Sequence, residues 1–234
     1  KNLIALPEID LDRFSDKYSP PDIAEAPEPQ IDRAAELQKK WKTSRGQIWE
    51  IGKHRLMCGD STSLKDISRL LDGRLPALMV TDPPYGVEYD PSWRQDAADK
   101  GLNGFSPNKD RLNGIEADDR INWTKAWALF PGCVVYIWHA SLFFGELLDG
   151  LRPLKFSPRS QLIWRKTSFA ISRGHYHWQH ETCLYAVKDG HSAGWAGDHS
   201  QSTVWDIASV VSHPGGSPEA PLSHSTQKPL ECMA

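Results

Sequence analysis

The chain of 234 residues lacks several features that would assign it to a special class of protein. It has no apolar run near the roughly 20 residues that a membrane-spanning helix requires, and no signal peptide is apparent at its first residues. Its four cysteines, Cys58, Cys133, Cys183 and Cys232, lie far apart in the sequence. We therefore expect free thiols in a reducing cytoplasm, and neither a disulfide framework nor a zinc site built on cysteine.

An excess of positive charge is also absent. There are 27 Lys and Arg residues against 30 Asp and Glu residues, a net charge of −3, which argues mildly against a nucleic-acid-binding protein. The distribution is less even, because residues 151–180 hold basic side chains and no acidic one. Such a stretch could neutralise phosphates, or it could be a solvated surface balanced by acids from elsewhere. The sequence leaves both interpretations open. The basic residues are Arg152, Lys155, Arg159, Arg165, Lys166 and Arg173.

The most informative segment present is Asp82-Pro83-Pro84-Tyr85, which follows the apolar run 77–80. The run predicts a buried parallel strand that is covered on both faces, and ligands of open α/β sheets bind at the carboxyl ends of strands. Proline has no amide hydrogen and a fixed φ, so the turn is stiff and rich in acceptors. Asp82 and a proline carbonyl can accept the two hydrogens of an exocyclic amino group, while Tyr85 stacks on the ring. The plainer interpretation is a turn that ends a strand.

The remaining chain divides into a leading segment and a globular part. We expect residues 1–45 to be an acidic, proline-rich linker followed by a helix over 31–41, and residues 46–234 to be the globular part. A hairpin is predicted over 48–57. Alternating strands and helices predict an α/β fold with a doubly wound sheet, and residues 90–118 are a predicted loop over the site. Strands are expected at 77–81, 134–138, 160–164, 182–187 and 202–206, and helices at 63–71, 122–130 and 142–151.

Several segments together resemble one enzyme family. In order, the chain is similar to the amino-methylating DNA methyltransferases of the permuted, or beta, class, in which Asp-Pro-Pro-Tyr precedes the cofactor loop. The resemblance covers residues 46–234 and is far more specific than one motif. The matching segments are 54–62, 77–86, 132–138, 161–166, 181–188 and 224–231.

The resemblance implies a Rossmann-like methyltransferase sheet and S-adenosyl-L-methionine as cofactor. It implies methylation of adenine N6 in double-stranded DNA, because Asp at the first motif position is more typical of the adenine enzymes in this family. Methylation of cytosine N4 is the alternative. A restriction-modification role in a bacterial or phage-type cytoplasm goes with it. The implied residues are Asp82, Pro83, Pro84 and Tyr85 for catalysis, Asp60, Lys228 and Pro229 for the cofactor, and Arg159, Arg165, Lys166, Arg173 and His175 for DNA.

One part of the family pattern is missing. A glycine-rich loop of the Asp-Pro-Phe-x-Gly-x-Gly type is expected after the segment at 224–231, and none is present. Gly215 and Gly216 lie in a Pro/Ser-rich stretch without the strand and helix that a cofactor loop needs. This suggests a fragment, or a split enzyme whose C-terminal half or second subunit supplies the loop. A catalytically incomplete DNA-binding fragment is the alternative.

Two further alternatives remain. Methylation of an amino or amide group on RNA or protein is disfavoured, because such relatives more often begin the tetrapeptide with Asn. A metal-dependent hydrolase at His175, His177 and His180 is disfavoured, because alternation along a strand places His180 on the opposite face from the other two. We expect no metal there, and interpret the histidines as lining a DNA channel or as packing.

Overall fold

The computed structural model describes residues 34–87, 121–170, 175–210 and 227–233. By contacts the chain divides into Lys1–Gln30, which lies outside the described residues, and Ile31–Ala234, to which everything below belongs. The predicted loop at 90–118 and the linker before residue 31 also lie outside the described part. No helix within the described residues is long and apolar enough to cross a membrane.

The first elements confirm the predicted helix and hairpin. Helix α2 spans Ala34–Trp41, and strands β1 (Ile48–Ile51) and β2 (His54–Met57) pair antiparallel as a separate two-stranded sheet. Helix α3 (Leu64–Leu71) begins after Ser63, whose side chain accepts a hydrogen bond from the amide of Asp66. This is an ordinary N-cap, in which a hydroxyl satisfies an amide of the first turn.

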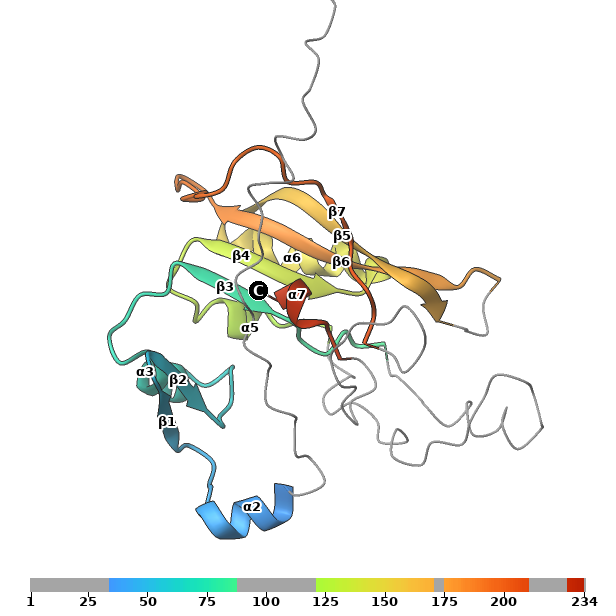
Figure 1. Ribbon diagram of the computed structural model, residues 1–234. Coiled ribbons are helices and arrows are strands. Elements are labelled where there is room, and N and C mark those ends of the chain that lie inside the picture. Colours follow the sequence, from blue (N-terminus) through green and yellow to red (C-terminus); the bar gives the residue numbers. More distant parts are fainter. Residues whose placement is uncertain (1–33, 88–120, 171–174, 211–226, 234) are drawn as a thin grey trace, which may run out of the picture. The chain divides into compact units, whose positions relative to one another are not determined.

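The larger of the two sheets in the described residues is mixed and has five strands (Figure 1). Its order is β3-β4-β6-β5-β7; β3 is parallel to β4, β6 is antiparallel to both β4 and β5, and β7 is parallel to β5. The α/β class is confirmed, and the sheet is mixed because β5 and β6 form a long hairpin without a crossover helix. The strands are β3 (Leu78–Thr81), β4 (Val134–His139), β5 (Phe156–Ala170), β6 (Trp178–Lys188) and β7 (Val204–Asp206).

Helices α5 (Thr124–Trp127) and α6 (Phe144–Leu151) contribute to a core on one face of the sheet (Figure 1). Trp127, Leu147 and Leu151 pack there against Val135 and Ile137 of β4. Two 3-10 turns, Ser141–Phe143 and Arg152–Leu154, flank α6. A second cluster on the other face includes Trp138, Leu162, Trp164, Ile207 and, from the short helix α7 (Leu230–Met233), Cys232.

One expectation about strand β3 is wrong. The continuous apolar run predicted that β3 would be covered on both faces, yet Leu78 is 47% and Val80 39% exposed. Only the alternate residue Met79 packs against the core cluster. Strand β3 is therefore half-buried at the edge of the sheet as the described residues form it, and its apolar sequence alone could not distinguish the two cases.

Candidate functional site

The tetrapeptide lies directly after β3, at the edge of the sheet where β3 and β4 both end. Because the two strands are parallel, their carboxyl ends meet there. The indole Nε1 of Trp123 donates to the carbonyl of Pro84 at 3.0 Å, which fixes the turn. Tyr85 packs against the second core cluster, beside Trp138. The predicted motif therefore occupies the predicted position.

Lys228 is brought to this turn from the far end of the sequence. Its Nζ lies 3.0 Å from Oδ1 and 2.9 Å from Oδ2 of Asp82, and 3.0 Å from the hydroxyl of Tyr85. The Tyr85 hydroxyl in turn donates to Asp82 Oδ1 at 2.9 Å. The Lys228 side chain is only 6% exposed, and its ammonium lies 5.2 Å from the ring centre of Tyr85. Two residues expected in different roles are thus in direct contact.

A second carboxylate, which the sequence reasoning did not single out, completes the group. Glu181 on β6 places Oε2 at 2.9 Å from Lys228 Nζ and 3.3 Å from the Tyr85 hydroxyl, and Oε1 at 2.5 Å from Lys166 Nζ. Its side chain is 21% exposed. We call Asp82, Tyr85, Glu181 and Lys228 the polar cluster. The signal that could have found Glu181 is a single carboxylate directly before the apolar part of β6, which pairs in register with Trp164 of β5.

The charges of the polar cluster hold one another in place. Burial would raise the pKa of Glu181, but Lys228 and then Lys166 more than compensate, so this pKa lies below its ordinary value. Burial would lower the pKa of Lys228, but Glu181 and then Asp82 outweigh it, so this pKa is raised. Burial, followed by the charges of Asp82 and Glu181, strongly raises the pKa of the Tyr85 phenol. At neutral pH the cluster therefore contains charged Glu181 and Lys228 and a neutral Tyr85.

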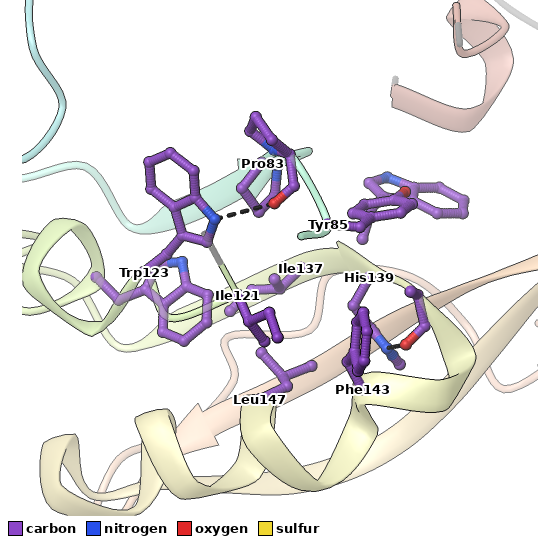
Figure 2. Close-up of a pocket in the computed structure, with 12 residues that line it drawn as sticks. Pro83, Tyr85, Ile121, Trp123, Ile137, His139, Phe143 and Leu147 are labelled. Atoms are coloured by element: carbon purple, nitrogen blue, oxygen red, sulfur yellow. Dashed lines mark hydrogen bonds between the residues drawn. The ribbon is translucent and has the colours of Figure 1, made fainter. Parts of the chain in front are cut away.

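Two cavities adjoin the prolines, and they differ greatly in size. The larger one holds about 380 Å³ and is lined by Asp82, Pro83 and Pro84 together with Trp123 and Ser61, a size that accommodates a small organic ligand. The smaller one, shown in Figure 2, holds only about 20 Å³ and has His139 in its wall, which is room for about one water molecule. The larger cavity has the volume of a flat heterocycle, whereas the smaller one, which Tyr85 lines, would have to open to admit one.

His139 is a buried neutral side chain in the smaller cavity. Its Nδ1 lies 3.0 Å from the carbonyl of Ala140, to which a ring N–H there donates, and its ring stacks on Phe144. Burial lowers its pKa below the ordinary value, against a smaller opposing effect of the Ala140 carbonyl. The Nε2 atom has no hydrogen-bond partner among the described residues.

The two other residues expected at the cofactor are held by local structure. Asp60 Oδ1 accepts from the amide and hydroxyl of Thr62 at 2.8 and 2.7 Å, so its side chain shapes its own turn, next to Ser61 in the larger cavity. Pro229 is fully buried, and its carbonyl accepts the amide of Cys232 at 3.0 Å. Both have a structural role, and their role toward a cofactor stays a prediction.

The basic stretch at 151–180 is balanced by acids from other elements. Arg165 forms a bidentate pair with Asp206 of β7, and Lys166 pairs with Glu181. Arg159 and His175 are exposed, and Arg173 lies outside the described residues. The solvated-surface interpretation therefore accounts for Arg165, and Lys166 belongs to the polar cluster. A DNA contact by any of the five stays a prediction.

The histidine segment forms aromatic contacts. The ring of His177 stacks on Phe169, and that of His180 meets the edge of Trp178. Within the described part of the chain, no group of three His, Cys, Asp or Glu residues is arranged to hold a metal ion. Tyr176 and Trp178 are 92% and 43% exposed, so this end of the β5–β6 hairpin presents aromatic rings to solvent.

Comparison with known proteins gives structural likenesses at low sequence identity. No family model matches the chain, and no curated protein matches it. Among solved structures, the crystal structure of the M1.HpyAVI–SAM complex is similar with 18% sequence identity and a TM-score of 0.42, over 72% of this chain and 68% of the other. The crystal structure of M1.HpyAVI alone is similar with 20% identity and a TM-score of 0.31, over 53% of this chain and 50% of the other. A functional assignment therefore has to come from the residues of the site.

Proposed function

We propose that this protein is a DNA amino-methyltransferase that uses S-adenosyl-L-methionine and acts on adenine N6. The observation that carries the proposal is the acceptor-rich turn of Asp82, Pro83 and Pro84 at the carboxyl end of β3, which forms one wall of the cavity of about 380 Å³. A carboxylate and an aromatic ring three residues apart suit a flat ring that bears an amino group. The ordered resemblance of residues 46–234 to the beta-class enzymes supports the same assignment.

The residues of the turn would act by holding the amino group in a reactive shape. An amino group on adenine is a poor nucleophile, because its lone pair is delocalised into the ring. Asp82 and the Pro83 carbonyl accept its two hydrogens and favour a more tetrahedral nitrogen with a localised lone pair. Positioning of this kind contributes more than strong base catalysis, and the proton leaves once the nitrogen is cationic.

The target base has to leave the DNA stack to reach the turn. Enzymes that modify a base inside a duplex rotate it out and replace the lost stacking with side-chain contacts. Tyr85 provides the ring for this purpose. The exposed aromatic end of the β5–β6 hairpin and the residues Arg159 and His175 would then contact the duplex.

The cavity fits the cofactor that the proposal requires. S-Adenosyl-L-methionine, when bound, supplies a methyl group on a positively charged sulfur. The volume of about 380 Å³ and the Trp123 ring in the wall suit its nucleoside part, and Asp60 would contact that end from the turn that contains Ser61. Lys228 would hold the methionine carboxylate. Pro229, between Lys228 and helix α7, would fix the start of that helix.

The decisive experiment is the transfer of labelled methyl from S-adenosyl-L-methionine to unmethylated DNA, followed by nucleoside analysis. The expected product is N6-methyladenine, and Asp82→Ala should reduce its formation at least about 100-fold, the usual loss when one acceptor or donor that acts on the reacting group is removed. Label in N4-methylcytosine would keep the mechanism and change the base. DNA binding without any transfer by the wild-type protein would contradict the proposal and favour a DNA-binding fragment.

A further inference from the structure

In the polar cluster, Lys228 forms a salt bridge with Asp82, the carboxylate that the proposed function uses to hold the substrate. Both oxygens of Asp82 lie within 3.0 Å of the Lys228 ammonium. The proposed function requires at least one of these oxygens to accept a hydrogen from the substrate's amino group. Lys228 therefore has to give up part of its contact with Asp82 when substrate binds, and a buried ammonium without a counter-ion would be costly.

Glu181 provides the alternative counter-ion. It holds the same ammonium at 2.9 Å from a different strand, and its second oxygen is fixed by Lys166 at 2.5 Å. The Lys166 ammonium also lies 4.9 Å from the centre of the Trp164 ring, so a cation that is itself held in place fixes Glu181 on the side away from Lys228. Cys183, on the same strand, adds no competing charge, because burial and then Asp82 raise the pKa of its thiol to about 12.

We infer that Glu181 is a positioning residue of this site, which retains Lys228 and orients Tyr85 while Asp82 exchanges its salt bridge for the hydrogens of the bound amino group. The inference rests on the proposed function for its catalytic consequence. Its structural content, that Glu181 holds Lys228 independently of Asp82, does not depend on any activity. Lys228 is faced by Asp82 and Tyr85 from the turn and by Glu181 and Cys183 from β6, and Lys166 of β5 lies beyond Glu181.

The first test follows the Lys228 ammonium by ¹⁵N NMR in lysine-labelled protein. In Asp82→Asn, Glu181 still holds the ammonium, so its signal should stay close to the wild-type shift and the pKa of Lys228 should not fall below the ordinary lysine value. In Glu181→Gln, we expect the pKa of Lys228 to fall below its wild-type value, because burial then outweighs the remaining carboxylate. The reverse pattern, with Lys228 released in Asp82→Asn and unchanged in Glu181→Gln, would overturn the inference.

The second test uses methyl transfer. Glu181→Gln should lower kcat about tenfold or more, because Lys228 then stays on Asp82 and competes with the bound amino group for the carboxylate oxygens. Glu181→Asp, which keeps the charge, should recover part of the loss. Asp149→Asn is the matched control, because Asp149 forms an exposed pair with Arg152 on α6; it should leave kcat unchanged.

The two tests separate the possible failures. If the wild-type protein transfers no methyl group, the proposed function fails, and the Lys228 signal still decides whether Glu181 retains this lysine. If transfer occurs and Glu181→Gln has wild-type kcat and KM, Glu181 is no positioning residue. If Glu181→Gln does not fold, as judged by near-UV circular dichroism, Asp82→Asn and Glu181→Asp still decide, because loss of the Lys228 shift in Asp82→Asn contradicts retention by Glu181.

Discussion

Tyr85 combines two properties in one side chain. Its hydroxyl contacts Asp82, Glu181 and Lys228, and its ring lies beside the turn where the proposed function places a base. The hydroxyl can donate to only one carboxylate at a time, while it accepts from Lys228. The ring and the hydroxyl can therefore be tested separately by two substitutions.

Tyr85→Phe should unfold at lower urea than wild type, because Asp82 and Lys228 lose a hydrogen-bond partner at a cost of about 1 kcal/mol. It keeps the ring, so its methyl transfer should stay within about tenfold of wild type. Tyr85→Ala also loses the stacking, worth about 1–3 kcal/mol per base, and should lose roughly 5- to 150-fold in kcat/KM for DNA. Equal loss of kcat/KM in both variants would show that the ring is not used.

The candidate site was only partly predictable from sequence, for a physical reason. Asp82 and Tyr85 lie three residues apart in the chain, so their proximity could be predicted from the sequence alone. Lys228 is 146 residues away from Asp82 and was predicted by resemblance, in a role at the cofactor and not as a partner of Asp82. Glu181 was missed because its function depends on which cations the fold brings to it. Ion pairs between distant elements leave no local pattern in the sequence.

Helices α5 and α6 approach each other closely at Gly150. A Cβ atom at this position would lie 2.6 Å from Thr124 Oγ1 and 2.9 Å from the ring of Trp127. Gly150→Ala should therefore destabilise the fold by about 1–3 kcal/mol, the usual range for overpacking, although alanine favours helix by about 1 kcal/mol. Urea unfolding measures the difference.

Gly145 in the same helix is the matched control. A Cβ atom there meets nothing within 4 Å, so Gly145→Ala should be neutral or stabilising by up to about 1 kcal/mol. If both alanine variants gained stability, the close packing of α5 against α6 at Gly150 would be wrong. Trp127 belongs to the core cluster, and Trp123 donates to the carbonyl of Pro84. We therefore also expect Gly150→Ala to shift the position of the Asp82–Tyr85 turn.

The boundaries of elements were predicted less well than their existence. Helix α5 was expected over 122–130 and spans Thr124–Trp127, because the amides of Leu129 and Phe130 bond to carbonyls three residues earlier and form tighter turns. Strand β5 was expected over 160–164 and spans Phe156–Ala170, because pairing with β6 extends it. Backbone hydrogen bonds set both limits, and hydrophobic periodicity does not report them.

The stability of the whole molecule should depend on pH through its buried ionisable groups. Glu181 and His139 have lowered pKa values in the folded protein. Their contributions to the free energy of unfolding are therefore complete above their unfolded pKa values of 4.5 and 6.5, and are lost as pH falls. Lys228 and Tyr85 have raised pKa values, so their contributions are complete below 10.5 and 10.0 and are lost as pH rises. The free energy of unfolding should be highest from about pH 7 to 10.

The acid side of this profile can be assigned to Glu181. At pH 7, Glu181→Gln should be less stable than wild type by on the order of 3 kcal/mol, because removing one partner leaves buried cations under-compensated. As pH falls below 4.5 and through the lower pKa of folded Glu181, this carboxylate in the wild-type protein becomes protonated and resembles the amide. Urea unfolding at a series of pH values should therefore show the two stabilities converging. A constant difference would mean that Glu181 contributes through packing, because only a charge contribution disappears when the carboxylate is neutralised.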